Sequence, residues 1–268
     1  MRIGGKEFDT NNRTYIMGIL NITPDSFSDG GSYRSMKDIL NRVETMVLEG
    51  ADIIDVGGES TRPGYTKLTD EEETARILPA IREIKKRFKV PVSVDTYKYA
   101  VAKAALCEGA DLMNDIWGFK YDTRMASLAA EYGCACCLMH NRENTEYVSF
   151  MDDCLADLKE SIGIAKSAGV RDEQIILDPG IGFGKTLEQN LMALKELKKF
   201  NLLGYPVLLG TSRKSVIGRT LDLPVDQRLE GTLVTSVLAV MDKIAFVRVH
   251  DIKENKRAID MATAIKNI

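Results

Sequence analysis

Short apolar runs alternate along the chain with longer segments in which apolar residues recur every three or four positions. Each run has the length and the continuous apolar character of a strand that is buried on both faces. Eight such runs occur, at residues 15–20, 53–56, 92–94, 112–113, 136–139, 175–177, 207–209 and 246–249. This pattern predicts a parallel sheet whose faces are covered by helices.

The segments between the runs have helical periodicity and helix-end signals. The clearest start is Thr69–Glu72, a capping-box sequence with acids in the first turn, and the same segment ends on Lys85, Lys86 and Arg87. Acids at the start and bases at the end suit the helix dipole. We expect helices at about 36–49, 69–88, 97–108, 123–132, 150–167, 187–199, 226–241 and 253–266.

Eight strand–helix units in 268 residues predict an α/β fold, a single-domain (β/α)8 TIM barrel spanning residues 1–268. A doubly wound open sheet is the alternative, but it more often has six strands and a Gly-rich nucleotide fingerprint after the first. Two connections, 21–35 and 57–68, are long and rich in turn residues. Because both follow strands, we expect them to form lids over the barrel face where active sites lie.

Composition restricts the function more than the fold. The net charge is -3, with 36 basic and 39 acidic residues, which argues against a strongly basic nucleic-acid binder. The longest uncharged apolar stretch, 231–241, is far shorter than the roughly 20 residues needed to cross a bilayer. The first residues lack the apolar segment of a secretory signal. We therefore expect a cytoplasmic protein that binds neither nucleic acid nor membrane.

Three of the five cysteines are clustered, at Cys134, Cys136 and Cys137. Zinc sites of this kind usually add a second Cys/His pair at regular spacing, and the sequence offers none. We expect a reduced protein in which these small apolar side chains belong to a buried strand that leads to His140.

Polar residues stand where the predicted strands end. They are Asn21, Asp55, Asp95, Asn114, His140, Asp178, the run Ser212–Ser215, and Arg248 with His250. One such residue is as readily explained by helix capping, but acids, amides and cations at every strand end are hard to assign to capping. In a barrel these positions converge on one rim, which predicts a binding site there.

The rim residues divide into two chemical groups. Asp95, Asn114 and Asp178 supply acceptors and an amide suited to a flat heterocycle with several N–H donors and a carbonyl. The second group contains donors suited to an anion, namely Arg62, Arg213, Arg248 and His250. The rim therefore predicts a ligand that is heterocyclic at one end and anionic at the other.

The segment Asp178–Thr186 ends like a phosphate-binding P-loop, but Pro179 takes the place of its first glycine. Binding of a nucleoside triphosphate is therefore not favoured. The glycines more plausibly let the backbone and Phe183 approach a planar ligand closely.

Four segments, taken in order, resemble the signatures of the dihydropteroate synthases, the sulfonamide-sensitive enzymes of folate synthesis. They are NITPDSFSDGG (21–31), DVGGESTRPG (55–64), DPGIGFGK (178–185) and SRKS (212–215). The match spans nearly the whole chain, and the first two motifs are long enough to be highly specific. Val216 stands where many members have Phe, next to the aminobenzoate pocket.

The resemblance implies the condensation of 6-hydroxymethyl-7,8-dihydropterin pyrophosphate with p-aminobenzoate to give 7,8-dihydropteroate and pyrophosphate. Loss of pyrophosphate would leave a pterin cation that the arylamine captures. The resemblance also implies Mg2+ as cofactor, sulfonamides as competitive inhibitors, and a homodimer formed through barrel helices opposite the lid face.

The resemblance further assigns residues to subsites. The pterin would be bound by Asp95, Asn114, Met139, Asp178, Phe183 and Lys214. The pyrophosphate would be bound by Asn21, Thr61, Arg248 and His250, with Asn21 as the metal contact. The p-aminobenzoate site would comprise Phe27, Thr61, Arg62, Pro63, Lys214 and Ser215. The residues expected to take part in catalysis are Asp29, Asp95, Lys214, Arg248 and His250.

Two other functions remain open. A methyltransferase that uses methyltetrahydrofolate could share the pterin pocket, and this hypothesis would depend on Asp95, Asn114 and Asp178 alone. The anion site at Arg248 and His250 and the two lid motifs count against it. A non-catalytic pterin-binding protein would also need the heterocycle pocket, but it would have little use for residues around a second substrate.

Overall fold

The computed structural model describes residues 1–22, 36–59 and 67–268. Eight parallel strands form one sheet, in the order β8-β7-β6-β5-β4-β3-β10-β9. They are β3 (Tyr15–Asn21), β4 (Ile53–Gly57), β5 (Val92–Asp95), β6 (Leu112–Asp115), β7 (Ala135–Met139), β8 (Ile175–Asp178), β9 (Leu208–Leu209) and β10 (Phe246–Val249). A parallel bridge between Leu177 and Val207 joins the two ends of this order. The sheet is therefore a closed barrel, which confirms the predicted fold and excludes the open sheet.

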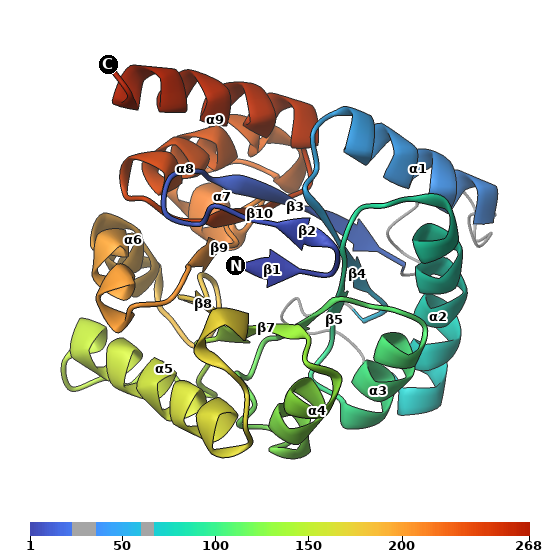
Figure 1. The fold of residues 1–268 in the computed structure, drawn as a ribbon. Coiled ribbons are helices and arrows are strands. Elements are labelled where there is room, and N and C mark those ends of the chain that lie inside the picture. The colour runs from blue at the N-terminus through green and yellow to red at the C-terminus, as the bar shows by residue number, and fades with distance from the viewer. Residues whose placement is uncertain (23–35, 60–66) are drawn as a thin grey trace.

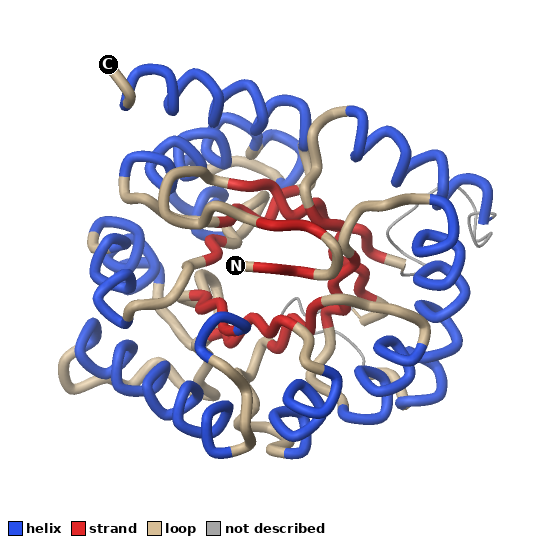
Figure 2. The backbone as a smooth tube through the Cα atoms, viewed as in Figure 1, coloured by secondary structure: helices blue, strands red, loops and turns tan. Residues whose placement is uncertain are grey.

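Helices surround the ring of strands, as Figures 1 and 2 show. They are α1 (Met36–Leu48), α2 (Asp70–Arg87), α3 (Tyr99–Cys107), α4 (Arg124–Tyr132), α5 (Phe150–Ser167), α6 (Leu187–Lys195), α7 (Ser215–Leu221), α8 (Leu229–Met241) and α9 (Ile252–Lys266). The predicted capping box is present, because the Thr69 side chain accepts from Glu72 N–H and the Glu72 side chain accepts from Thr69 N–H. The predicted helices are confirmed, most of them within three residues at each end.

Several short elements of the described chain were not predicted. A hairpin of β1 (Arg2–Ile3) and β2 (Lys6–Glu7) lies across the centre of the ring in Figure 1. Helix α7 has seven residues, and the predicted helix 187–199 gives way after α6 to the 3-10 helix η3 (Leu197–Leu203). Elements of this length contain too few residues to show a hydrophobic periodicity, so tertiary packing determines whether they form.

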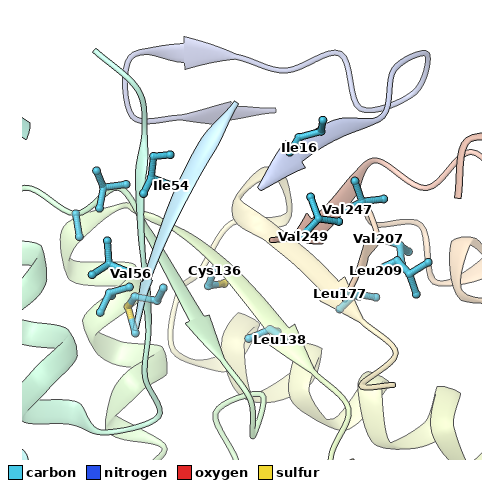
Figure 3. Close-up of a cluster of buried hydrophobic side chains, with 14 of the residues drawn as sticks. Ile16, Ile54, Val56, Cys136, Leu138, Leu177, Val207, Leu209, Val247 and Val249 are labelled. Carbon is cyan, nitrogen blue, oxygen red and sulfur yellow. The ribbon is translucent and has the colours of Figure 1, made fainter. Parts of the chain in front are cut away.

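The strands present two apolar faces, because successive side chains of a strand point to opposite sides. One set packs outward against the helices, and Figure 3 labels members of it such as Val56, Leu138 and Val249. The other set fills the lower interior of the barrel together with Ile3 and Phe8 of the N-terminal segment. The hairpin thus covers the end of the barrel where the strands begin.

The interior of the barrel changes from apolar to polar as the strands proceed. Along β10, Phe246 belongs to the interior core, and the next inward positions are Arg248 and, after the strand, His250. Along β4, the inward Ile53 is followed by Asp55 and Gly57. The inward positions at the carboxyl ends of the strands therefore bring polar groups from separate strands into one place.

The five cysteines are free thiols, four of them buried. Cys136 packs in the outer core and Cys137 in the interior core. Burial raises the pKa of the Cys134 thiol to about 12 and those of Cys136 and Cys137 well above their usual value. Among the described residues, no helix is long and apolar enough to span a bilayer.

The two predicted lid connections, 21–35 and 57–68, fall largely outside the described residues, because positions 23–35 and 60–66 are not described. Five predicted site residues lie in these two ranges, namely Phe27, Asp29, Thr61, Arg62 and Pro63.

Candidate active site

An open cavity of about 290 Å³ lies at the carboxyl end of the barrel. Seven of the predicted site residues line it: Asn21, Asp95, Phe183, Lys214, Ser215, Arg248 and His250. These residues come from β3, β5, the loop after β8, the segment around the start of α7, and β10. Seven predicted residues that are far apart in the sequence therefore meet in one cavity, whereas the predicted Asn114, Met139 and Asp178 are buried and are not among the residues that line it.

A group of polar side chains connects β4, β5, β6 and β10, and two of its members, Asp95 and Arg248, line the cavity. Arg248 Nε donates to Asp55 Oδ2 at 2.6 Å, and its Nη2 donates to Asp95 Oδ2 at 2.6 Å. Asn114 Nδ2 also donates to Asp55 Oδ2, at 3.2 Å. Within the described part of the chain, the buried Asp55 Oδ1 has no hydrogen-bond partner. Asp55 Oδ1 can therefore accept a hydrogen bond from a ligand or from a water molecule.

The electrostatics of this group follow from burial and proximity. Burial raises the pKa of Asp95 to about 7, although the Arg248 guanidinium acts in the opposite direction. Burial also disfavours the charge of Arg248, but Asp55 and Asp95 outweigh that effect and raise its pKa above the usual value. Arg248 is therefore always a cation, whereas Asp95 can bind a proton near neutral pH.

A second charged group converges on Gly210, where the absence of a side chain leaves space. A Cβ at Gly210 would lie 3.6 Å from Asp178 Oδ2 and 3.7 Å from Lys214 Nζ. Burial lowers the pKa of Lys214 to about 8, and Asp178 opposes that shift. Burial raises the pKa of Asp178 against the influence of Lys214. The two groups therefore stabilise each other's charged forms inside the barrel.

The loop after β8 contacts the Lys214 ammonium through a carbonyl and an aromatic ring. Lys214 Nζ donates to Ile181 O at 2.6 Å and lies 4.8 Å from the centroid of the Phe183 ring. Gly180 N–H donates to Asp178 Oδ1 at 2.7 Å. One short loop thus contacts both the predicted acid and the predicted lysine of the heterocycle pocket.

An apolar wall stands beside these charges. Tyr97, Ile116 and Met139 form a small buried cluster, and Trp117 and Phe183 pack against it. Acceptors and an ammonium next to aromatic and thioether side chains suit a flat ring that hydrogen-bonds at its edge.

The opposite side of the cavity carries groups suited to an anion. Ser212 Oγ accepts from His250 N–H at 3.2 Å and lies 2.9 Å from His250 Nδ1, which fixes the imidazole ring. A Cβ at Gly57 would lie 3.5 Å from Asn21 Oδ1 and 3.6 Å from Asp95 Oδ2, so two acceptor oxygens, which suit a cation or a donor rather than an anion, converge beside Gly57.

A cluster of buried charges lies beside the second long connection. Lys98 Nζ donates to Glu59 Oε2 and to Glu73 Oε2, both at 2.7 Å, and to Leu68 O at 2.8 Å. Tyr97, a member of the apolar wall, donates its hydroxyl to Glu59 Oε1 at 3.0 Å. Glu59 therefore joins the apolar wall to both ends of the segment that contains Thr61, Arg62 and Pro63.

Two rim predictions need correction. His140 was expected on the rim, but it is fully buried and bonds to Asp157 of α5, so that prediction is wrong. It follows Leu138 by two positions, and Leu138 faces the helices. Arg213 lines the cavity but pairs with Asp251, with Nε 3.0 Å from Oδ2, so its charge is already compensated.

Other site features were missing from the sequence prediction. The sequence pattern places Asp55 at a strand end without indicating a role, and it gives no signal for the contacts made by Ser212 and the Ile181 carbonyl. The inward alternation along each strand would have identified Asp55. Val216, where many dihydropteroate synthases have Phe, is buried near the start of α7.

Comparison with known proteins identifies the relatives of this chain. The family model described as pterin binding enzyme matches residues 17–250. Dihydropteroate synthase of Clostridium beijerinckii is 60% identical over 266 residues, covering 99% of both chains. The enzyme of Bacillus subtilis is 51% identical, covering 95% of this chain and 90% of the relative.

Solved structures agree with these relatives. A Clostridium difficile dihydropteroate synthase crystallised with pteroic acid superposes with a TM-score of 0.94 at 49% identity, covering 97% of this chain and 99% of that one. The Yersinia pestis enzyme in a sulfonamide complex also gives a TM-score of 0.94, at 36% identity, covering 100% of this chain and 99% of that one. The chain therefore belongs to the pterin binding enzyme family and, within it, to the dihydropteroate synthases.

Proposed function

We propose that this enzyme condenses 6-hydroxymethyl-7,8-dihydropterin pyrophosphate with p-aminobenzoate, giving 7,8-dihydropteroate and pyrophosphate. The observation that carries the proposal is one cavity in which an edge-binding group for a heterocycle lies beside donors for an anion. Lys214, which lines the cavity, and the buried Asp178 next to it form the first group. Arg248 and His250, which also line the cavity, belong to the second. A substrate that is a pterin at one end and a pyrophosphate at the other matches both.

The heterocycle is bound through its edge and its faces. The Asp178 carboxylate accepts from adjacent ring and amino N–H groups, and the Lys214 ammonium donates to the ring carbonyl. Asn114, whose Nδ2 already donates to Asp55, presents its carbonyl to a further ring N–H. Met139 and Phe183 contact the faces of the ring.

The reaction breaks the C–O bond to pyrophosphate and leaves a positive charge on the pterin methylene. Arg248 uses Nε and Nη2 for Asp55 and Asp95 and keeps Nη1 for a phosphate oxygen, and His250 supplies a second donor. The same two carboxylates stabilise the developing pterin cation. The arylamine nitrogen then forms the C–N bond, and its proton leaves with pyrophosphate.

The residues present fit Mg2+ carried with the pyrophosphate. The described residues contain no group of three or more His, Cys, Asp or Glu ligands that could form an all-protein metal site. Mg2+ usually needs just one or two protein oxygens besides phosphate and water, and Asn21, whose Oδ1 converges with Asp95 Oδ2 near Gly57, lines the same cavity as Arg248 and His250. When bound, the ion would neutralise charge on the leaving pyrophosphate. Asn21 would hold it.

The arylamine site would be formed by Lys214 and Ser215 together with Phe27, Thr61, Arg62 and Pro63 of the undescribed segments. Sulfonamides, which resemble p-aminobenzoate, would compete for it. The test is pyrophosphate release measured with both substrates: release should require p-aminobenzoate, and a sulfonamide should raise the KM for p-aminobenzoate without lowering kcat. Methyl transfer from methyltetrahydrofolate, or pterin binding without turnover, would support the alternatives instead.

Pyrophosphate with Mg2+ should stabilise the enzyme against heat, because both ligands bind the native state. At a ligand concentration 100 times the Kd, the expected stabilisation is about 2.7 kcal/mol. A thermal melt with and without millimolar pyrophosphate and Mg2+ measures the shift. His250→Ala should reduce the shift, and no shift at all in the unmodified enzyme would contradict the anion site.

We also propose a homodimer formed through α8 and α9, which pack side by side. Both helices expose apolar side chains, chiefly in their C-terminal halves and thus toward the barrel end opposite the lids: Val234, Leu238, Met241, Met261 and Ile265. An apolar patch of this kind on a barrel surface usually marks an interface. Five free thiols suit a reducing compartment, and we place the enzyme in the cytoplasm.

Light scattering after size-exclusion chromatography tests the interface. The unmodified chain should elute as a dimer, and the double substitution Val234→Glu/Met261→Glu should give a folded monomer, because it places charges within the apolar patch. A monomeric unmodified chain, or a charged variant that remains dimeric, would contradict this interface.

A further inference from the structure

Lys185 ends the segment that resembles a P-loop, but its side chain does not face the cavity. It is buried, with 9% of its surface exposed, and it passes behind the loop that it terminates. Its Nζ lies 3.0 Å from Gly180 O, 3.0 Å from Phe183 O and 2.7 Å from His140 Nδ1. Burial lowers the pKa of Lys185 to about 7, and in its protonated form the ammonium has three N–H donors, so these three acceptors use all of them.

The third acceptor is itself fixed by a buried carboxylate. His140 Nε2 lies 3.0 Å from Asp157 Oδ2, and Arg142 Nε donates to the same oxygen at 2.6 Å. Because an ionised carboxylate accepts only, Nε2 carries the ring proton, and Nδ1 is left as the acceptor for Lys185. Burial lowers the pKa of His140 to about 4, so the ring stays neutral. Asp157, His140 and Lys185 thus form one directed chain of hydrogen bonds.

The loop that Lys185 holds has little stiffness of its own. Gly180, Gly182 and Gly184 all have positive φ, a conformation open to glycine at low cost and one that leaves the unbound loop many alternatives. At Gly180 the backbone presses against the preceding loop so closely that a Cβ would lie 1.9 Å from His140 O. One backbone bond closes a turn within the loop, from Phe183 N–H to Gly180 O at 3.1 Å, and the rest of its shape depends on bonds to side chains.

Other hydrogen bonds also hold the loop, but each of them reaches a single loop residue. Tyr147 donates its hydroxyl to Gly184 O at 2.7 Å, and Gly182 N–H donates to Asn190 Oδ1 at 2.6 Å. Lys185 differs from these bonds because it binds Gly180 O and Phe183 O together and so reinforces the turn that the bond from Phe183 N–H to Gly180 O closes. Ile181, whose carbonyl accepts from Lys214, lies within that span.

We propose that Lys185 is a positioning residue for the pterin site. Through the backbone of residues 180–183 it directs the Ile181 carbonyl at the Lys214 ammonium and sets the Phe183 ring against the cavity. The assignment of a pterin as the ligand rests on the proposed function, whereas the geometry of the network does not. Lys185 thus affects binding of the pterin although its own side chain does not line the cavity.

Lys185→Met tests the proposal, since methionine keeps most of the apolar stem and removes all three donors. We expect the Kd of a pterin pyrophosphate and its KM to rise at least about tenfold, while the KM for p-aminobenzoate changes much less. Lys166→Met removes an exposed lysine that pairs with Asp172 and should leave every parameter unchanged. Asp157→Asn keeps the shape of the side chain but removes the charge behind His140, so it should give a smaller rise in the Kd and KM of the pterin pyrophosphate. This variant replaces Lys185→Met in the test if Lys185→Met does not fold.

The outcomes separate a positioning role from a structural one. Variants that melt at a lower temperature but bind and turn over the pterin normally when folded would overturn the proposal. If the unmodified enzyme binds the pterin without turnover while Lys185→Met weakens that binding, the proposed function fails and the positioning role stands.

Discussion

Lys214→Ala is expected to abolish turnover, lowering kcat/KM by about a thousandfold or more, while the barrel remains folded. The ammonium lies within the cavity, donates to Ile181 O and faces Asp178 across Gly210. Its removal takes away a donor to the pterin and a neighbour that favours the charged form of Asp178. Both losses weaken binding of the heterocycle at the site of reaction.

Steady-state kinetics and circular dichroism on the same preparation check this prediction. Lys253→Ala, at an exposed position near the start of α9, supplies a matched control and should behave as the unmodified enzyme. Near-normal activity of purified, folded Lys214→Ala would exclude a role for this lysine in the reaction.

Arg248→Met is expected to remove activity and to destabilise the fold by about 3–5 kcal/mol, because it leaves buried carboxylates without their cation. Asp55 and Asp95 each accept from this guanidinium at 2.6 Å. The cation lowers the pKa of Asp95, so its loss must raise that pKa above about 7. A carboxyl whose pKa is higher in the folded than in the unfolded state destabilises the fold as pH rises between the two values. The loss of unfolding free energy in Arg248→Met, relative to the unmodified enzyme, should therefore be larger at pH 8 than at pH 6.

Urea unfolding at the two pH values measures this deficit. Arg82→Met is the matched control, because Arg82 pairs with Glu108 at an exposed position where solvent screens an ion pair and leaves it little effect on stability. Adding Asp95→Asn to Arg248→Met should restore part of the stability. An Arg248→Met variant as stable as the unmodified enzyme at pH 8 would show that the buried charges are compensated in another way.

The fold could be predicted because the strands are buried on both faces and the helices are long enough to show their period. The site was predicted in part for a related reason. Asp95, Asp178 and Arg248 stand at inward positions near the carboxyl ends of their strands, and the closed barrel brings these ends together. The polar strand ends therefore indicated a real cavity.

The errors at the rim arose from counting strand ends without counting inward positions. His140 lies on the same side of its strand as Leu138, which faces the helices, whereas Met139 faces the apolar wall. Asp55 has the parity of Ile53 and so belongs inside. This information was present in the sequence, since the side-chain period of a strand is two.

Other features have no signal in the sequence pattern. The direction of Lys185 depends on a glycine loop with positive φ at three positions, and no hydrophobic period records that path. The bond from the Lys214 side chain to the Ile181 carbonyl joins residues that are 33 positions apart in the sequence. Such contacts become visible with the packed structure, because any residue type can offer a carbonyl.

The most direct measurement is product formation by the purified enzyme with 6-hydroxymethyl-7,8-dihydropterin pyrophosphate, p-aminobenzoate and Mg2+. Mass spectrometry should detect 7,8-dihydropteroate, with one pyrophosphate released for each molecule formed, and neither product should appear with Lys214→Ala. A folded, unmodified enzyme that binds the pterin but forms no dihydropteroate would contradict the account.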